Sequence, residues 1–407
     1  MPAISNPSTL NKVPKLRFPG FSGEWEEKKL GEVCDYKNGG SFENNLIVNG
    51  KYNLITLNSI DIAGKLKNNH KTVDSADWYL KKDDMVMVLS DVAHGNFLGL
   101  VDIIPKDNKY VLNQRMGLLR KKDADVNLDF LRIYINNKQR YFKLHGQGSS
   151  QQNLSKGDIL KFKILTPSLS EQQKIASFLG STDEWIENLR TQKQSLESYK
   201  KGMMQKIFSQ EFRFQDDNGK DFPKWEEKKL GEYLIHSSKR NTDNKVSLVL
   251  SVSNTRGFIA QSEQFEDHRV ASKEVLNYKI VNRGDFAYNP SRINVGSIAV
   301  LKQYEVGIVS PMYVVFKLAN KLDSVYFEHL IRTHRMKHLI KIGCSGSVRD
   351  SLNFDDMAKF KLQFPDIKEQ QKIADFLTSI DSLLESKRQQ IMQTEQWKRG
   401  LMQNMFV

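Results

Sequence analysis

The chain has 407 residues, enough for two or three domains with substantial cores, and its 39% hydrophobic content lies above the disordered range. Lys and Arg outnumber Asp and Glu by 61 to 48, and so basic a chain typically binds a polyanion, nucleic acid first. Only two cysteines, Cys34 and Cys344, are present, which excludes a disulfide framework and predicts a reduced, cytoplasmic protein. No run of eighteen apolar residues and no apolar signal core occur, so we expect neither a membrane span nor a signal peptide.

The sequence repeats with a period close to 200 residues. Residues 25–32, Trp-Glu-Glu-Lys-Lys-Leu-Gly-Glu, recur letter for letter at 225–232. Residues 171–176, Glu-Gln-Gln-Lys-Ile-Ala, recur at 369–374. This period is far longer than the 20 to 50 residues of solenoid repeats, so it predicts two copies of one module. The copies diverge between these islands, which indicates a common frame that carries two different surfaces.

Each copy mixes short strand patterns, turns and brief helical runs, which predicts α+β domains at 17–165 and 213–363 after a polar N-terminal segment at 1–16. Trp25 and Trp225 belong to the repeated frame and are expected to anchor the two cores. The segments that we expect to be strands are 84–89, 285–288, 297–301 and 312–316, and those expected to be helices are 130–135 and 326–331.

Two long helices are predicted after Pro167 and Pro365, at 166–212 and 364–407, with Ser170 as the N-cap of the first. Apolar residues recur in alternating steps of four and three between 175 and 207, and again 198 residues later. Because this stripe is narrow, we expect the two helices to pair as a coiled coil. Polar seam positions fix the register of such a coil, and they are Lys193, Lys200, Lys387 and Lys398.

The distribution of charge separates the helices from the domains. Residues 171–210 have a net charge of +1 and residues 369–405 a net charge of zero, so +12 of the +13 lies elsewhere. We therefore expect the helices to act as a spacer and the globular domains to meet the polyanion.

Polar loops occupy matching places in the two copies. Residues 146–153 are rich in glycine and amides, and residues 343–350 hold small residues and an arginine at the corresponding place. Segments 90–96 and 291–297 correspond in the same way. Asn and Gln side chains can bond adenine and Arg can bond guanine, so these loops are candidate base readers. An ordinary surface turn has the same composition, and the residues alone leave both interpretations open.

The sequence lacks recognisable catalytic, nucleotide-binding and metal-binding motifs. Residues 289–291, Asn-Pro-Ser, only partly match the Asn/Asp-Pro-Pro-aromatic motif with which an adenine methyltransferase holds its base, and neither a dinucleotide-type glycine turn nor a P-loop occurs. The Glu-x-Lys steps at 26–28 and 226–228 are better explained by a solvated strand edge than by a nuclease site. His334 and His338 lack a third zinc ligand. We predict no catalytic residue, no metal and no cofactor.

Taken together, the two Trp-x-x-x-x-Leu-Gly-Glu openings and the two Pro…Glu-Gln-Gln-Lys-Ile-Ala-x-Phe-Leu helices resemble the specificity subunit of type I restriction–modification systems. The resemblance implies two target recognition domains, each reading half of a split site on double-stranded DNA, and two spacer helices that pair in an antiparallel coil. It also implies candidate DNA-binding residues, namely Ser90, Asp91, His94, Asn96, Asn113, Gln114, Arg115, Ser149, Ser150, Gln151 and Gln152 in the first domain, and Ser291, Arg292, Asn294, Ser297, Ser347 and Arg349 in the second.

The resemblance further implies partners, namely two modification subunits that carry the methyl donor, and restriction subunits in the full complex. Two alternatives remain open at this point. A fused DNA adenine methyltransferase would need the motifs that the chain lacks. A protein-only coiled-coil adaptor would leave the charge of the domains without a function.

Overall fold

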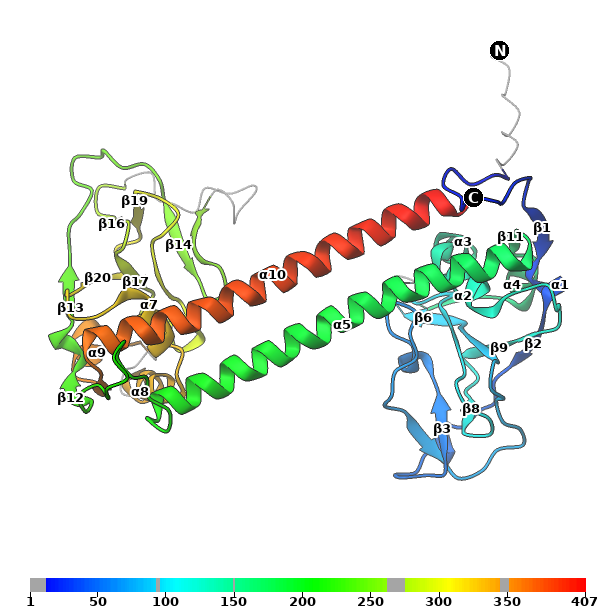
Figure 1. Cartoon of the computed structure of the whole chain (residues 1–407), viewed down its shortest axis with the longest axis horizontal. Coiled ribbons are helices and arrows are strands. Elements are labelled where there is room, and N and C mark those ends of the chain that lie inside the picture. Colours follow the sequence, from blue (N-terminus) through cyan, green and yellow to red (C-terminus); the bar gives the residue numbers. More distant parts are fainter. Residues whose placement is uncertain (1–11, 93–95, 149–150, 262–274, 345–350) are drawn as a thin grey trace, which may run out of the picture. The chain divides into compact units, whose positions relative to one another are not determined.

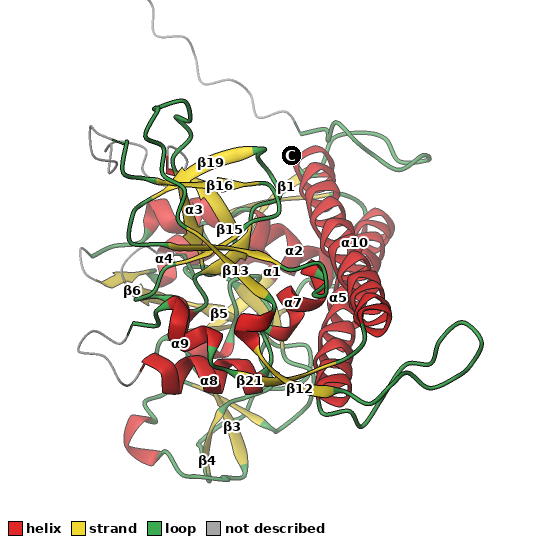
Figure 2. Ribbon diagram, turned by 90° about the vertical axis from the view of Figure 1, so that its left-hand side faces the viewer, coloured by secondary structure: helices red, strands yellow, loops and turns green. Residues whose placement is uncertain are grey.

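The structure is a computed structural model of the whole chain, and it describes residues 12–92, 96–148, 151–261, 275–344 and 351–407. The chain divides into two compact units. Unit 1 comprises Met1–Arg190 and Gln389–Val407, and unit 2 comprises Thr191–Arg388. Each unit holds one globular α+β domain and a part of each of two long helices (Figures 1 and 2).

The described part of the globular domain of unit 1 contains two larger sheets and two separate strand pairs. Its strands are β1 (Glu26–Lys29), β2 (Cys34–Asn38), β3 (Tyr52–Ile55), β4 (Lys71–Val73), β5 (Met85–Val88), β6 (Ser90–Val92), β7 (Val101–Ile103), β8 (Tyr110–Leu112), β9 (Met116–Lys121), β10 (Gln151–Asn153) and β11 (Lys163–Thr166). The order β2-β9-β5-β7 forms an antiparallel sheet, and β4-β3-β8 forms a second sheet in which β3 and β8 are parallel. The two separate pairs are β1-β11 and β6-β10. The helices are α1 (Leu30–Val33), α2 (Leu128–Asn137), α3 (Gln139–His145) and α4 (Lys156–Leu160), with 3-10 turns η1 (Glu43–Asn45) and η2 (Leu57–Ser59).

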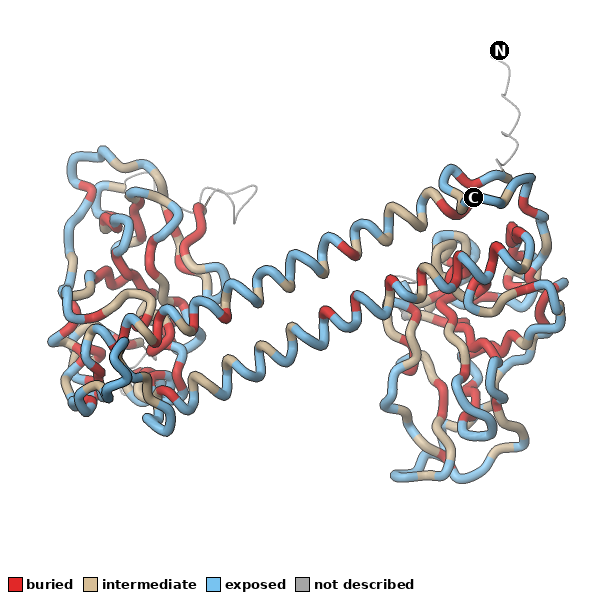
Figure 3. The backbone as a smooth tube through the Cα atoms, in the orientation of Figure 1, coloured by how far each residue is buried: buried red, intermediate tan, exposed pale blue. Residues whose placement is uncertain are grey.

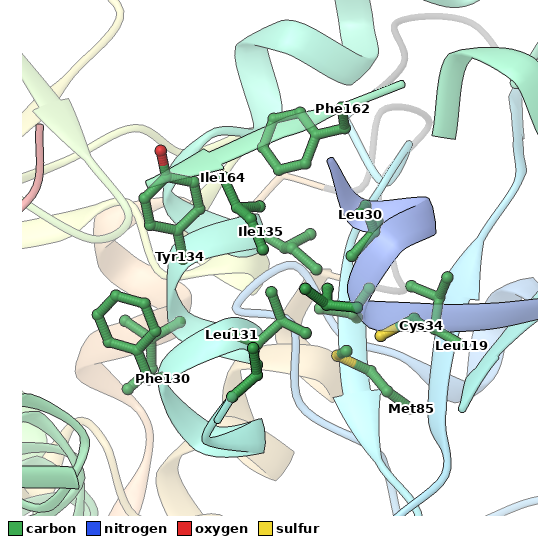
Figure 4. Packing of buried hydrophobic residues seen from close by; sticks show 14 of the residues in the cluster. Leu30, Cys34, Met85, Leu119, Phe130, Leu131, Tyr134, Ile135, Phe162 and Ile164 are labelled. Atoms are coloured by element: carbon green, nitrogen blue, oxygen red, sulfur yellow. The ribbon is translucent and has the colours of Figure 1, made fainter. Parts of the chain in front are cut away.

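One apolar core joins the first sheet of unit 1 to its helices (Figure 4). Met85 and Leu119 from the sheet pack with Leu131 from α2, and all three are fully buried. Near the end of the chain, Phe406 enters the same core, and its ring lies edge-on to Trp25 at a centroid distance of 6.3 Å. Residues far apart in the sequence therefore share one core, and Trp25 anchors it as predicted.

Unit 2 repeats the same frame. Its strands are β12 (Glu226–Lys229), β13 (Leu234–Ser237), β14 (Leu250–Ser253), β15 (Gly257–Ala260), β16 (Lys279–Asn282), β17 (Phe286–Tyr288), β18 (Ile298–Val300), β19 (Val306–Val309), β20 (Val314–Leu318) and β21 (Lys361–Phe364). The antiparallel order β13-β20-β17-β18 matches the first sheet of unit 1, while β14 pairs with β15 and β16 with β19. The helices are α7 (Ser324–Leu330), α8 (His334–Cys344) and α9 (Phe354–Ala358), with 3-10 turns η3 (Leu230–Glu232) and η4 (Ile293–Val295).

The strands predicted to match, β5 and β17, occupy the same place in the two sheets. A buried aspartate precedes each of them. Asp84 accepts a 2.7 Å bond from Arg120 Nε, and Asp285 lies 4.0 Å from Lys317 Nζ, both partners coming from the neighbouring strand. The copies thus keep a buried aspartate beside a partly exposed cation, although the geometry of the pair has diverged.

The repeated Trp-Glu-Glu-Lys-Lys-Leu-Gly-Glu segment closes each domain. Strand β1 pairs with β11 and β12 with β21 in the same register, and the glutamates of β1 and β12 are exposed, as a solvated edge requires. The leucine that follows is fully buried in both copies. At Gly231 a Cβ atom would lie 2.8 Å from that of Ala358, and Gly31 meets Leu160 at 3.1 Å. The motif is therefore explained by strand pairing and close packing, not by catalysis.

Two long helices follow the domains, α5 (Leu169–Phe208) and α10 (Ile367–Met405). Along each helix, buried and partly buried residues recur at the predicted steps of four and three between exposed ones (Figure 3). The predicted N-cap is wrong. Ser168 precedes the first helical residue and accepts a 3.4 Å bond from the backbone N–H of Glu171, whereas Ser170 lies inside the first turn. Among the described residues, no helix is long and apolar enough to cross a membrane.

The helices run antiparallel within each unit. In unit 1, Lys398 Nζ lies 2.6 Å from Asp183 Oδ1, and in unit 2, Lys200 Nζ lies 2.6 Å from Asp381 Oδ1. Both lysines were predicted to lie on the seam, and their two aspartates are 198 residues apart. The same antiparallel register therefore holds in both units, and the polar seam positions supply the pairs that fix it.

The Glu-Gln-Gln motif fastens each helix to its domain. Glu171 and Glu369 are buried, and each accepts two bonds from one guanidinium, that of Arg17 and that of Arg213. The glutamine after each glutamate bonds two backbone groups of its own domain and the carbonyl of the proline that precedes the helix. Trp225 Nε1 also donates to Glu369 at 3.0 Å. Such buried, saturated polar contacts fix the angle at which each helix leaves its domain.

Candidate nucleic-acid interface

Three polar loops meet in unit 1, and we define them as residues 90–96, 113–115 and 148–153. Strands β6 and β10 pair, with Asp91 opposite Gln152. The backbone N–H of Leu89 donates to the carbonyl of Arg115 at 3.1 Å, and its carbonyl accepts from Leu154 N–H at 2.8 Å. Segments that the sequence singled out separately therefore form one surface around Leu89.

Several predicted residues of this surface hold the loops in place. Ser90 is buried and accepts a bond from Gln151 Nε2, while Asp91 accepts the N–H of Phe97 at 2.9 Å. Asn113 is only 5% exposed and accepts the N–H of Arg115 at 3.4 Å. Ser90 and Asn113 are thus covered by protein, and their polar groups stabilise the loops through internal hydrogen bonds.

Other side chains of unit 1 face solvent. Arg115 is exposed and has no ion pair with another described residue. Gln114 is exposed but bonded to Glu43 at 2.8 Å, and Asn96 is exposed and accepts from Lys143 Nζ at 2.8 Å. Gln152 Oε1 is buried and has no hydrogen-bond partner among the described residues. The remaining predicted residues, His94, Ser149 and Ser150, lie outside the described residues.

A tight turn requires glycine at the start of the third loop. Gly148 has φ of 115°, which side chains rarely adopt, and a Cβ atom there would lie 2.1 Å from the carbonyl oxygen of Gln151. The neighbouring Gln147 pairs with Asn153 through two backbone hydrogen bonds of 2.9 Å. The backbone of this loop is therefore closely specified at its described ends.

In unit 2 the loop 291–297 occupies the matching place. Ser291, Arg292 and Asn294 are exposed, whereas Ser297 is buried and donates its hydroxyl to the carbonyl of Val252 at 2.8 Å. The N–H of Leu352, which follows segment 343–350 in the chain, donates to the carbonyl of Pro290, directly before this loop, at 3.1 Å. Ser347 and Arg349 lie outside the described residues.

One exposed cation beside this loop escaped the sequence analysis. Arg256 lies at the tip of the β14–β15 hairpin, where Ser253 Oγ accepts its backbone N–H at 3.3 Å. A Cβ atom on Gly296 would lie 3.7 Å from that of Asn254 in the same tip, so hairpin and loop are neighbours. The available signal was the Ser-Asn-Thr-Arg-Gly turn, but nothing in the sequence shows that this turn lies beside loop 291–297.

The model of the type I restriction modification DNA specificity domain matches the chain twice, over residues 22–198 and 217–396. The chain belongs to this family.

Individual relatives are distant but nearly as long as the chain. A type I restriction enzyme MjaVIII specificity subunit of Methanocaldococcus jannaschii is 24% identical over 72% of this chain and 73% of the relative. A putative type I restriction enzyme MjaX specificity subunit of the same organism is 23% identical over 93% and 92%. In fold, the chain resembles the type I S subunit from M. genitalium, with a TM-score of 0.61 at 16% identity over 97% of this chain and 99% of that one. A chain from a study of complex assembly in the type I R-M system has a TM-score of 0.56 at 14% identity, with the same coverage.

The described part of this surface can donate and accept hydrogen bonds. Exposed arginines and amides match base edges and phosphates. Among the described residues, no group of three or more His, Cys, Asp or Glu side chains could hold a metal. Burial raises the pKa of the Cys34 thiol to about 12, so it is not a nucleophile at neutral pH. Specificity subunits are non-catalytic recognition subunits, so neither the methyltransferase nor the adaptor alternative is favoured.

Proposed function

We propose that each unit of this specificity subunit reads one half of a bipartite double-stranded DNA sequence. The observation that carries the proposal is the joining of separate polar loops into one surface on the frame of unit 1, together with the same strand order and a polar loop, 291–297, at the matching place in unit 2. The frames share strand order and helix anchors, but the exposed side chains differ, with Arg115 and Asn96 on one and Arg292, Asn294 and Arg256 on the other. A common frame with different donors suits two readers of different sequence.

Chemistry would come from partner subunits. The chain lacks motifs for a methyl donor or for base flipping, so two modification subunits would supply both, and restriction subunits would join the full complex. This chain needs no cofactor of its own for that role. A complex that acts on cellular DNA would work in the cytoplasm, where Cys34 and Cys344 stay reduced.

Individual arginines test the reading role. In a complex with the modification subunits, Arg292→Ala should weaken binding by about 1–3 kcal/mol at one position of one half-site if it reads a base, and uniformly over all sequences if it holds a phosphate. Arg115→Ala should act on the other half-site alone. A matched control is Arg283→Ala, because Arg283 is exposed but engaged with Glu305 at 2.8 Å. Unchanged DNA binding in both test variants would refute the reading role of these loops.

The paired helices would set the distance between the half-sites. Their burial pattern is continuous, and their charge is nearly balanced. Adding one heptad to both helices keeps the seam in register and lengthens them by roughly 10 Å, or about three base pairs. The methylated motif should keep both half-sites and gain spacer length. An active complex with an unchanged spacer would show that the helices do not set it.

A further inference from the structure

A cationic cleft recurs in both units, apart from the polar loops. In unit 1 a cleft of about 680 Å³ lies between the α2–α3 junction and the two long helices. In unit 2 a cleft of about 830 Å³ lies between the start of α8 and the same two helices. Each cleft is contained within its own unit.

The helix wall of the cleft is the same in both copies. Lining residues of one cleft recur 198 positions away in the other, namely Asp183 and Asp381, Lys398 and Lys200, and Arg399 and Lys201. The facing walls come from the divergent domains and differ in sequence. The two copies thus share the charged helix wall of the cleft, while the domain wall opposite differs between them. This pattern indicates a binding site and not a gap left by packing.

Positive charge dominates both clefts. Six Lys or Arg and two carboxylates line the first, and five Lys or Arg and two carboxylates line the second. The carboxylates are already paired with cations. In unit 1, Asp183 pairs with Lys398 and Glu395 with Arg190, both at 2.6 Å. In unit 2, Asp381 pairs with Lys200 at 2.6 Å and Glu197 with Lys193 at 2.8 Å. The cations that have no ion pair with another described residue are Lys65, Arg140 and Arg399 in unit 1, and Lys201, Arg332, Arg335 and Lys337 in unit 2.

A short helix connects each cleft with the polar loops. Helix α3 begins at Gln139, which lines the cleft and donates to the carbonyl of Asn96, and it ends directly before segment 146–153. Helix α8 begins at His334, also in the lining, and ends at Cys344, before segment 345–350. At 1.5 Å per residue these helices span about 10 and 16 Å, which is roughly three to five base pairs of DNA.

We propose that the two clefts bind backbone phosphates of the DNA beside each half-site, an inference that rests on the proposed function. Exposed Lys and Arg without acidic partners bind phosphate and release its counterions, and such contacts position a protein without reading sequence. An acidic face of a protein partner would also match the charge. The direct connection of each cleft to the polar loops through α3 and α8 favours DNA.

The test measures how DNA affinity depends on salt for the complex with its modification subunits. Arg140→Gln with Arg399→Gln removes two cations from the unit 1 cleft, and Lys201→Gln with Arg335→Gln does so in unit 2. Because each phosphate contact contributes about 0.9 to the slope of log K against log salt, each pair should reduce its magnitude by about 1.8. Duplexes with and without the methylated motif should lose affinity by the same factor, and the motif should not change.

A control pair removes the same charge elsewhere in unit 1. Lys82→Gln with Lys174→Gln changes one exposed lysine of the domain and one of α5, neither of which lines the cleft. An unchanged slope in both cleft variants, or an equal effect of the control, would overturn the inference. Loss of the modification subunit with normal DNA binding would assign the clefts to protein. A wild-type complex that ignores the motif would instead refute the proposed function.

Discussion

Replacing the buried carboxylate of Glu369 should detach helix α10 from its domain. Glu369 is fully buried, accepts Arg213 at 3.1 and 2.6 Å, and accepts Trp225 Nε1 at 3.0 Å. Glu369→Gln keeps the shape but removes the charge, so one of these donors then faces an NH₂ group. Breaking a buried ion pair costs about 3–5 kcal/mol. Arg213 is 25% exposed and can regain some hydration, so we expect the lower end, about 3 kcal/mol.

Two measurements test this predicted loss of stability. Urea unfolding gives the change in free energy, and native-state hydrogen exchange locates it. Exchange should accelerate in the first turns of α10 and remain slow in the first turns of α5, because the anchor of α5, Glu171, belongs to unit 1. Glu171→Gln should show the reverse pattern. The double variant should be additive within about 0.5 kcal/mol, because the anchors share no partners.

Glu27→Gln is the matched control, since it removes a carboxylate from an exposed pair with Lys163. It should leave the unfolding midpoint nearly unchanged. The reasoning is refuted if Glu369→Gln changes neither the midpoint nor the exchange of α10, or if it accelerates exchange equally in both units.

Two further predictions concern stability. Burial, reinforced by the nearby Lys200, lowers the pKa of His329 to about 4 despite the opposing charge of Asp381, so folding favours neutral histidine. Stability should therefore fall as pH drops below the unfolded value near 6.5, by about 2 kcal/mol between pH 7 and 5, and urea titrations of His329→Leu should lack this component; equal pH slopes would contradict the assignment. Gly231→Ala should lower the melting temperature because its Cβ meets backbone and side chain, whereas Gly202→Ala, with open space around it, should stabilise helix α5 by up to about 1 kcal/mol. Equal changes in melting temperature for the Gly231→Ala and Gly202→Ala variants would contradict this prediction.

Sequence periodicity predicted the helices and their seam because a burial stripe depends only on spacing along one chain. It could not predict the register, which depends on how far one helix slides along the other. The partners Asp183 and Asp381 become visible only when each is placed opposite its lysine. The Glu-Gln-Gln repeat was likewise noticed, but its role stayed hidden until Arg213 was found beside Glu369.

The sequence predicted the positions of the interface loops better than it predicted which of their side chains are exposed. Duplicated, amide-rich segments indicated where the loops lie, because that signal survives in the sequence. Which side chains face solvent depends on tertiary packing, so Asn113 and Ser297 were included although both are buried. Arg256 was missed because the proximity of its hairpin to loop 291–297 depends on tertiary packing. Loop position is thus encoded locally, whereas side-chain exposure depends on the fold.

The most direct test of two independent readers is an exchange of one of them. Residues 20–165 would be replaced by the matching segment of a relative whose methylated motif is known, and the chimaera would be expressed with its modification subunit. The methylated motif would then be mapped on cellular DNA. One half-site should become that of the relative, while the half-site read by unit 2 stays the same. A motif in which both halves change, or neither does, would contradict the account.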